Sequence, residues 1–133
     1  MFLDYLNKKY VSTYNHVIIS YLHSRFADKV IEDYGKVDIL INNAAIGIGE
    51  GVEGRQVTAE GLELLLATNH LGPLHLTTRL LPVLADTGKV ITISSDSNLH
   101  VESVNPGDLN SEQNYTPHTL YATTKLYNIM MTR

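Results

Sequence analysis

The sequence contains no cysteine. This absence excludes disulfide bonds, thiolate metal sites and thiol nucleophiles, and it is compatible with a reducing compartment. Long apolar runs are also absent, since the longest, at residues 16–23 and 38–41, fall far below the roughly 18 residues that a membrane-spanning helix needs. We therefore expect no membrane segment in this chain.

An excess of basic charge is likewise missing. Lys and Arg total 10 against 14 Asp and Glu, which gives a net charge of -4, and the basic residues are scattered along the chain. Because charge-driven binding to nucleic acid or to an anionic membrane surface needs a clustered basic patch, we expect neither partner. The first residues also lack the basic start, apolar middle and cleavage site of a signal peptide, so we expect a cytoplasmic location.

The composition that is present suits a folded protein. Hydrophobic residues make up 44% and charged residues 18% of 133 residues, values typical of a soluble globular domain. This length suits one domain and leaves no room for a second. We therefore predict a single domain over residues 1–133.

Apolar spacing predicts helices that alternate with short buried strands. Helices are expected over residues 22–34, 59–85 and 120–131, and strands over 37–42 and 89–94. Such alternation is typical of parallel βαβ units, so the predicted fold class is α/β with a doubly wound parallel sheet.

The boundaries of these elements rest on local signals. Thr58 is expected to cap the long middle helix, and the Thr-Gly pair at 87–88 to end it. Residues 97–118 have the composition of a long loop, while 16–20 have the apolar character of a strand. Residues 1–15 show no period and stay unassigned.

Small residues with amide or hydroxyl groups follow both predicted strands. In open parallel sheets, ligands bind outside the carboxyl ends of the strands, so these residues are candidates for a binding site. A structural explanation stays open beside the functional one, because Asn pairs form Asx-turns and Ser ends many strands. The candidates are Asn42, Asn43, Ala44 and Ala45 after the first strand, and Ser94 and Ser95 after the second.

Pro73 interrupts the helical pattern of the middle segment. Proline has no N–H, so the backbone carbonyl of Asn69, four residues earlier, is left without its helical partner. A spare carbonyl beside an amide side chain suits a water or a lysine ligand, although a kink packed in the core would have the same sequence. His70 and His75 lie five residues apart with no carboxylate, a poor arrangement for a metal, and we predict no metal site.

The pattern Tyr-x-x-x-Lys occurs twice, at Tyr5 and Lys9 and at Tyr121 and Lys125. On a helix this spacing places both side chains on one face. The first match lies in the unassigned segment, whereas the second lies on a predicted helix after the Asn and Ser candidates. We therefore expect only the second to carry chemistry.

Four motifs, in order, are similar to those of one family. They are LINNAA at 40–45, Asn69 in an Asn-x-x-Gly position, ITISS at 91–95 and YATTK at 121–125. Over about residues 26–133 the chain resembles the short-chain dehydrogenases/reductases, and most of all their retinol dehydrogenase-like branch. The resemblance implies a Rossmann-like fold and hydride transfer between NAD or NADP and a lipophilic alcohol or carbonyl, with a retinol-like small molecule as the substrate.

The resemblance also implies a role for each matching residue. Tyr121 would exchange a proton with the substrate oxygen, and the positive charge of Lys125 would stabilise the phenolate and bind the nicotinamide ribose. Ser95, rather than Ser94, would bind the substrate oxygen, because the second serine of the pair is the active one in the family. Asn69 would hold a water that passes protons to Lys125.

The cofactor residues implied by the resemblance lie at the first strand end. Asn42, with Asn43 and Ala44, would line the adenosine side, and Lys125 would act on the ribose. Ala45 departs from the family pattern, which has glycine there.

A larger departure is the lack of the Thr-Gly-x-x-x-Gly-x-Gly turn that seats the pyrophosphate. The glycines at 47–54 follow the first strand and stand in the wrong place for it. We therefore expect a partial Rossmann-like domain, without the N-terminal glycine-rich βα unit and the C-terminal part.

Alternatives to an active enzyme stay open. A truncated fragment of such an enzyme would bind no cofactor and would act through association with another subunit. A small α/β binding module would need all four motifs to be coincidence. The chain could also form a homo-oligomer. A more complete form of the protein could associate with a membrane.

Overall fold

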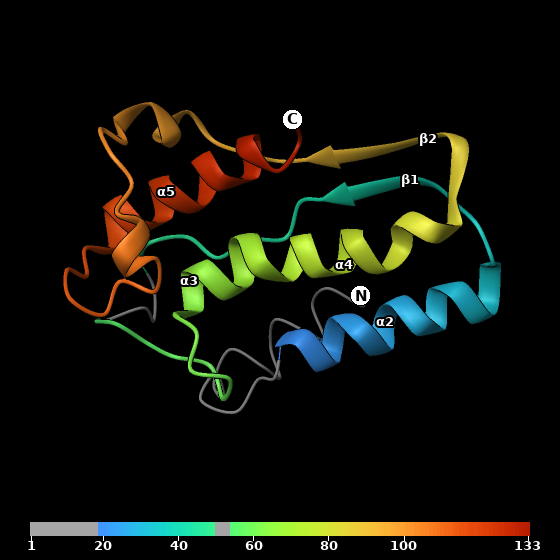
Figure 1. The fold of residues 1–133 in the computed structure, drawn as a ribbon, viewed down its shortest axis with the longest axis horizontal. Coiled ribbons are helices and arrows are strands. Elements are labelled where there is room, and N and C mark those ends of the chain that lie inside the picture. The colour runs from blue at the N-terminus through green and yellow to red at the C-terminus, as the bar shows by residue number, and fades with distance from the viewer. Residues whose placement is uncertain (1–18, 50–53) are drawn as a thin grey trace.

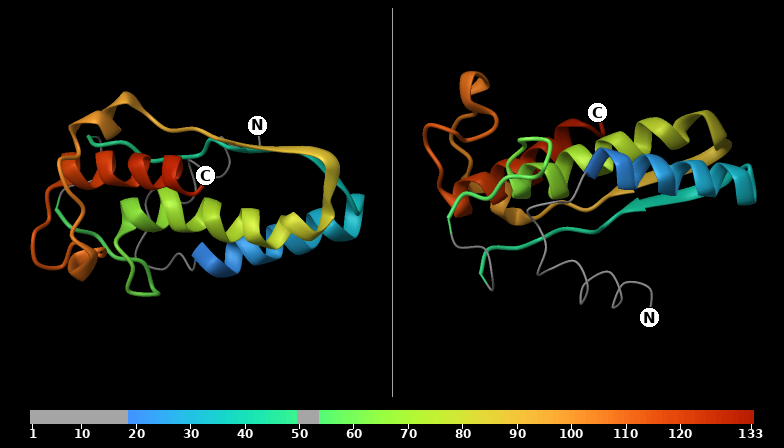
Figure 2. Two further views of the ribbon diagram at one scale, coloured as in Figure 1. Left: turned by 45° about the horizontal axis from the view of Figure 1, so that its top comes forward. Right: turned by 90° about the horizontal axis from the view of Figure 1, so that it is seen from below.

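The computed structural model describes residues 19–49 and 54–133 and shows helices packed on a two-stranded parallel sheet (Figure 1). Helices α2, α4 and α5 lie on the same side of the sheet in the views of Figures 1 and 2. The elements in chain order are α2 (Ile19–Tyr34), β1 (Val37–Asn42), α3 (Leu64–Leu66), the π-helical turn η2 (Ala67–Leu71), α4 (Gly72–Leu80), the 3-10 turn η3 (Leu81–Val83), β2 (Leu84–Thr92), the 3-10 turns η4 (Asp96–His100) and η5 (Pro106–Asp108), and α5 (Pro117–Met130).

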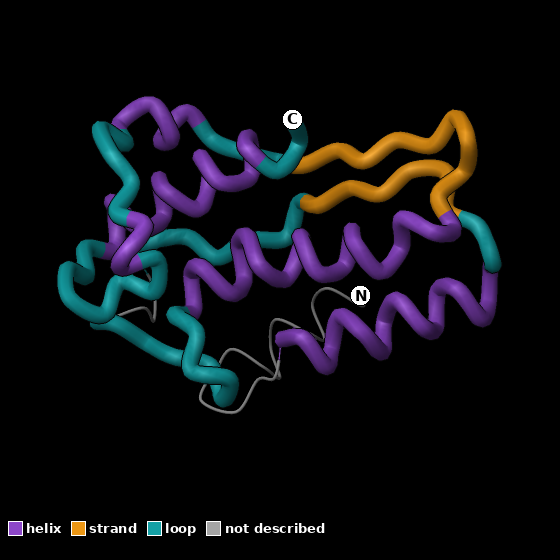
Figure 3. The backbone as a smooth tube through the Cα atoms, viewed as in Figure 1, coloured by secondary structure: helices purple, strands orange, loops and turns teal. Residues whose placement is uncertain are grey.

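The sheet confirms the predicted α/β class, as a partial Rossmann-like layer. Strand β1 coincides with the prediction, and its partner β2 runs parallel to it after the helical crossover (Figure 3). Regular pairing extends from Ile39 opposite Lys89 to Asn42 opposite Thr92. Strand β2 begins five residues earlier than predicted and ends at Thr92 rather than at residue 94, and its first residues continue along β1 past an irregularity in register. Thr87-Gly88 lies inside this strand, so the prediction that the pair ends the middle helix is wrong.

The predicted start of the middle helix at Thr58 is wrong. Glu63 is the N-cap, and its Oε2 accepts a hydrogen bond of 2.8 Å from the Leu66 N–H. The Thr58 hydroxyl instead accepts N–H bonds within its own turn, which Gly61 closes with φ of 78°. That left-handed backbone favours glycine and cannot belong to a helix, so the helical stretch begins only after it.

The middle helical stretch ends at Val83 rather than at the predicted residue 85, and it changes geometry in its interior. Turn η2 is wound as a π-helix, in which the Gly72 N–H bonds the Ala67 carbonyl. Pro73 follows in the first turn of α4, as expected where a helix must restart without a donor. A Cβ at Gly72 would lie 2.7 Å from Cε1 of the His23 side chain and 3.2 Å from the Ala67 carbonyl oxygen, so a larger residue there would require that side chain to move.

Helix α2 begins earlier than predicted and includes Ile19 and Ser20, so the proposed strand over 16–20 is wrong for these two residues. The remainder of that segment, with Tyr5 and Lys9, lies outside the described residues. The predicted stop of this helix is confirmed, because Gly35 adopts φ of 65° and its N–H bonds the Ile31 carbonyl.

The expected loop over 97–118 contains the short turns η4 and η5, and its last residues belong to α5, which starts three residues before the predicted boundary. No helix within the described part of the chain has the length and apolar character needed to cross a bilayer.

The core lies where α3 and η2 meet α5 and where α2 packs beside α4. One face of the sheet lies toward α4, while the isoleucines on the opposite face stay open to solvent. The exposed fractions are 58% for Ile39, 57% for Ile41 and 42% for Ile91, and Ile93, directly after β2, is 41% exposed. The buried apolar side chains are Ala27, Leu64, Leu65, Leu66, Ala67, Leu80, Leu120 and Ala122.

Removing a core leucine tests this packing. Leu65 is 0% exposed, and we expect Leu65→Ala to lower the free energy of unfolding by about 2–5 kcal/mol, because the cavity adds to the lost burial. Leu99 is 79% exposed, so Leu99→Ala serves as the matched control and should change stability by less than about 0.5 kcal/mol. Urea denaturation measures both, and equal losses would contradict the described core.

Candidate active site

Tyr121 and Lys125 lie one turn apart on α5, and the Lys125 ammonium contacts the tyrosine ring. Nζ of Lys125 lies 5.5 Å from the ring centroid, a distance at which a cation is attracted to an aromatic face. Lys125 is only 3% exposed, and none of the ion pairs found among residues 19–49 and 54–133 includes it. Burial lowers the pKa of Lys125. The helix thus holds a buried cation beside a phenol without a carboxylate to neutralise it.

The two serines at the end of β2 have different partners. The Ser94 hydroxyl donates a hydrogen bond of 2.7 Å to the Lys125 carbonyl and so ties the strand to α5. Ser95 caps η4, where its Oγ accepts the Ser97 N–H at 3.2 Å. The turn η4, which Ser95 caps, packs against α5, while the side-chain hydrogen bonds of Ser95 are with its neighbours Asp96 and Ser97. The anchoring role of Ser94 had no signal in the sequence.

The Asn69 side chain is buried, 1% exposed, and uses both ends of its amide on one backbone unit. Its Oδ1 accepts the Ile46 N–H at 2.8 Å, and its Nδ2 donates to the Ile46 carbonyl at 3.0 Å. The same Nδ2 lies 3.4 Å from the hydroxyl of Thr124 on α5. Both ends of the Asn69 amide are therefore engaged, and Pro73, four residues later, has no N–H to donate to the Asn69 backbone carbonyl.

The residues expected to bind a cofactor separate into two kinds. The Asn42 amide is buried and donates to the Thr77 hydroxyl at 2.8 Å, with the Thr92 hydroxyl at 3.4 Å, so it joins β1 to α4 and β2. Asn43 and Ala44 are exposed at the carboxyl end of the strand. A ligand that approaches this edge would therefore meet Asn43 and Ala44, with Asn42 supporting them from inside.

The loop before α5 is fixed by a polar cluster that the sequence did not indicate. The Asn110 Oδ1 accepts the Glu63 N–H at 2.7 Å, and its backbone carbonyl accepts two bonds from the Arg55 guanidinium, at 3.1 and 3.2 Å. Burial raises the pKa of the Glu63 carboxyl. These contacts join the N-terminus of α3 to the loop that leads into the Tyr121 helix.

The histidines considered for a metal have other partners. His70 Nδ1 lies 3.1 Å from the Asn128 Oδ1, and His75 Nε2 lies 2.9 Å from the Ser24 hydroxyl. Within the described residues, no three His, Asp or Glu side chains gather in an arrangement that could hold a metal ion.

Comparison with known proteins identifies the family. The sequence profile described as short chain dehydrogenase matches residues 20–133. The chain belongs to the short chain dehydrogenase family. Retinol dehydrogenase 14 of Mus musculus and of Homo sapiens is 34% identical over 110 residues, which cover 81% of this chain and 31% of the relative.

Two solved structures share the fold of this chain. An uncharacterized protein from Mycobacterium Paratuberculosis matches with a TM-score of 0.70 and 37% identity over 83% of this chain and 37% of its own. A short chain dehydrogenase from Burkholderia cenocepacia J2315 in complex with NADP has the same fold, with a TM-score of 0.56 and 20% identity over 85% of this chain and 40% of its own. This short chain dehydrogenase chain spans about a third of the length of the curated relatives it matches.

Replacing Lys125 tests the cost of its burial. We expect Lys125→Met to raise the melting temperature at neutral pH, because methionine fills the site without a buried charge. Lys89 on β2 is exposed, so Lys89→Met is the matched control and should leave the melting temperature nearly unchanged.

The difference in stability between Lys125→Met and the unsubstituted chain should depend on pH. Since burial lowers the pKa of Lys125, the unfolded chain binds that proton more tightly than the folded chain. Wild-type stability should therefore rise with pH between the lowered pKa and the ordinary lysine pKa, and the advantage of the Met variant should shrink over that window. A gap that widens with pH, measured by thermal unfolding in a buffer series, would contradict this account.

Proposed function

We propose that this chain is the catalytic-helix part of an oxidoreductase that transfers a hydride between NAD(P)(H) and a lipophilic alcohol or carbonyl. One observation carries the proposal: the buried ammonium of Lys125 lies beside the Tyr121 ring on α5 and has no carboxylate partner among the described residues. The turn η4, which Ser95 caps, packs against the same helix. The name of the retinol dehydrogenase relatives supports a retinol-like substrate. Residues 1–133 would then form part of one NAD(P)-binding domain.

Proton exchange at the substrate oxygen is the task of Tyr121 in this proposal. A phenol has an ordinary pKa near 10, so it needs a nearby positive charge to act as phenolate at neutral pH. Lys125 supplies that charge. In the reducing direction the Tyr121 hydroxyl gives its proton to the oxygen as the carbonyl becomes an alcohol, and in the oxidising direction the phenolate takes the proton back.

Ser95 is assigned to the same oxygen. A hydroxyl both donates and accepts hydrogen bonds, so Ser95 can bind the substrate as a carbonyl or as an alcohol. A water on the Asn69 carbonyl would resupply protons by way of Lys125.

Residues at the exposed end of β1, together with the buried Lys125, would bind part of a dinucleotide cofactor. Lys125 would bind ribose hydroxyls, while Asn43 and Ala44 would let the ligand approach the backbone, with Asn42 behind them. The nicotinamide, when bound, supplies or accepts the hydride. Neither NAD nor NADP is favoured by these residues.

The open isoleucine face of the sheet favours a second candidate, a fragment that binds no cofactor and associates with another subunit. Unpaired sheet edges and exposed apolar strands promote pairing with other chains. Thermal unfolding with and without NADH or NADPH separates the two candidates. A cofactor-dependent rise in melting temperature supports the oxidoreductase, whereas an unchanged transition together with self-association in ultracentrifugation supports the fragment.

Tyr121→Phe tests the proton donor. With NADPH or NADH and retinaldehyde as the probe, we expect turnover to fall by roughly 10²- to 10⁴-fold, because the ring stays while the proton is lost. Cofactor affinity, measured by nucleotide fluorescence, should stay unchanged. Tyr21 on α2 is 52% exposed, and Tyr21→Phe is the matched control. Wild-type turnover in Tyr121→Phe would overturn the assignment.

The two serines form a matched pair for a further test. We expect Ser95→Ala to lower turnover by roughly 10²- to 10³-fold with little change in stability, because a donor to the reacting oxygen is lost. Ser94→Ala should instead lower the free energy of unfolding by about 1 kcal/mol, because the bond to the Lys125 carbonyl is lost. If Ser94→Ala lowered the turnover of the folded protein more than Ser95→Ala does, the assignment of Ser95 would be wrong.

A further inference from the structure

A second polar contact behind the Tyr121–Lys125 turn joins three elements. Asn128 on α5 is 3% exposed, and its Oδ1 lies 3.1 Å from Nδ1 of His70 in turn η2. The Nδ2 of the same amide donates to the backbone carbonyl of Ile93, at 3.3 Å, just beyond the end of β2. The Asn128 side chain thus connects α5 to the π turn η2 and to the segment that follows β2.

The chemistry of these contacts fixes the form of the histidine. A backbone carbonyl can only accept, so the end of the Asn128 amide that faces Ile93 must be the NH₂ group. The Oδ1 is then the atom that faces His70, and it too can only accept. Nδ1 of His70 must therefore carry a hydrogen, because the opposite amide orientation would set two oxygens against each other.

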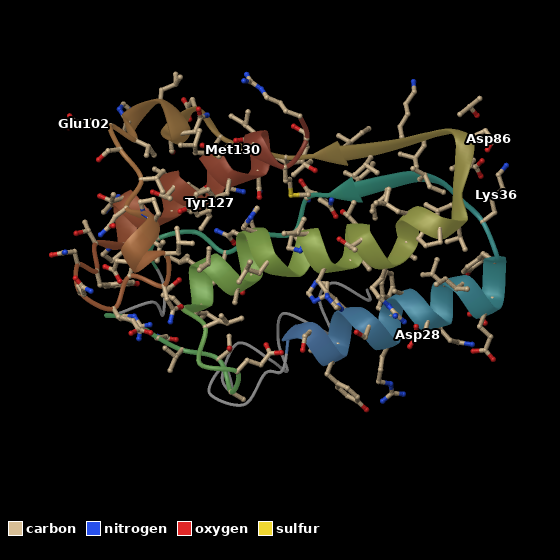
Figure 4. All side chains as sticks on the ribbon, in the orientation of Figure 1. Asp28, Lys36, Asp86, Glu102, Tyr127 and Met130 are labelled. Atoms are coloured by element: carbon tan, nitrogen blue, oxygen red, sulfur yellow. The ribbon has the colours of Figure 1, made fainter. Side chains whose placement is uncertain are left out.

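The surroundings of His70 favour the neutral ring. Burial lowers the pKa of His70, and the ring packs beside that of Tyr127 on α5, labelled in Figure 4, with centroids 5.2 Å apart. None of the ion pairs among the described residues includes His70. A neutral ring with hydrogen on Nδ1 therefore satisfies the contact without adding a charge at a partly buried position.

The contact between Asn128 and Ile93 helps to fix the position of α5 relative to the residues that follow β2. Asn128 follows Lys125 by one turn, and Ile93 directly precedes Ser94, whose hydroxyl bonds the Lys125 carbonyl. Two bonds therefore join the same turn of α5 to consecutive residues of the strand end. A helix held at both points cannot rotate or rise without breaking these two bonds.

We propose that His70 and Asn128 are positioning residues, which hold α5 against the serine strand so that Lys125 stays buried beside Tyr121. The catalytic meaning of this role rests on the proposed function. The positioning itself is independent of turnover, because it concerns the environment of Lys125 in the folded chain.

The tautomer of His70 in the unsubstituted chain gives the first test. Long-range ¹H–¹⁵N spectra of the full chain distinguish a protonated Nδ1 from a protonated Nε2, and His70→Phe assigns the signals. We expect the Nδ1–H form in the unsubstituted chain and its loss in Asn128→Leu. An Nε2–H ring, or an Nδ1–H signal that persists in Asn128→Leu, would overturn the proposal.

The pKa of Lys125 gives the second test, which a general loss of stability would not mimic in a folded variant. NMR titration of ¹³C-labelled lysine should show the Lys125 pKa moving upward, toward the ordinary lysine value, in His70→Phe and Asn128→Leu, because a loosened helix admits water. His118 is exposed in the first turn of α5, so His118→Phe is the matched control and should leave that pKa unchanged. An unchanged Lys125 pKa in a folded His70→Phe chain would refute the positioning role.

Cofactor binding and turnover are measured separately from both NMR tests. A chain that binds neither NADH nor NADPH but shows both expected NMR results would refute the proposed function and leave the positioning of Lys125 in place. A chain that turns over substrate without the expected tautomer and pKa shift would do the reverse.

Discussion

The amide of Asn69 makes the contact on which the arrangement of the site depends. A chain that leaves the end of a buried strand has backbone donors and acceptors that need partners. Asn69 supplies both to Ile46, a few residues beyond β1, and extends to Thr124 on α5. The strand end, the π turn and the Tyr121 helix are thereby held to one another by a single buried side chain. The π turn itself, which ends just before Pro73, presents Asn69 and His70 to the neighbouring elements.

Lys125 shows what this arrangement costs. An ammonium buried beside a ring, with its pKa lowered by burial and no carboxylate partner, lowers the stability of the folded state. A carboxylate would remove that cost, but it would also neutralise the charge that a neighbouring phenolate needs. The surrounding contacts, from Ser94 to the Lys125 carbonyl and from Asn128 to the strand, hold the helix in a position that the lysine alone would not favour. Functional sites often contain such residues, which lower the stability of the folded state but supply the required chemistry.

The sheet is the less complete part of the molecule. Its two parallel strands carry α4 on one face, while Ile39, Ile41 and Ile91 on the other face are open to solvent. Parallel sheets are normally covered on both faces. The chain spans about a third of the length of the retinol dehydrogenase relatives. The helical side of this chain, by contrast, has a packed core of its own around α3.

The sequence by itself determined the features that depend on near neighbours. The run of apolar residues defined β1, Gly35 ended α2, and the spacing of four placed Tyr121 and Lys125 on one helical face. The order of Asn, Ser and Tyr motifs identified the family, which the profile match over residues 20–133 confirms. These features could be read because periodicity, glycine conformation and helical spacing act over a few residues.

Only the tertiary structure decided which polar groups meet across the fold. Glu63 rather than Thr58 begins the middle helix, because Gly61 turns the chain between them. The partners of Asn42, Ser94 and His70 lie 35, 31 and 58 residues away in the sequence. Each of these side chains had several plausible partners along the chain. Packing of α5 against η4 and η2, and of α4 against β1, selected among them, because a buried polar group must find its partner in whatever surface the core brings beside it.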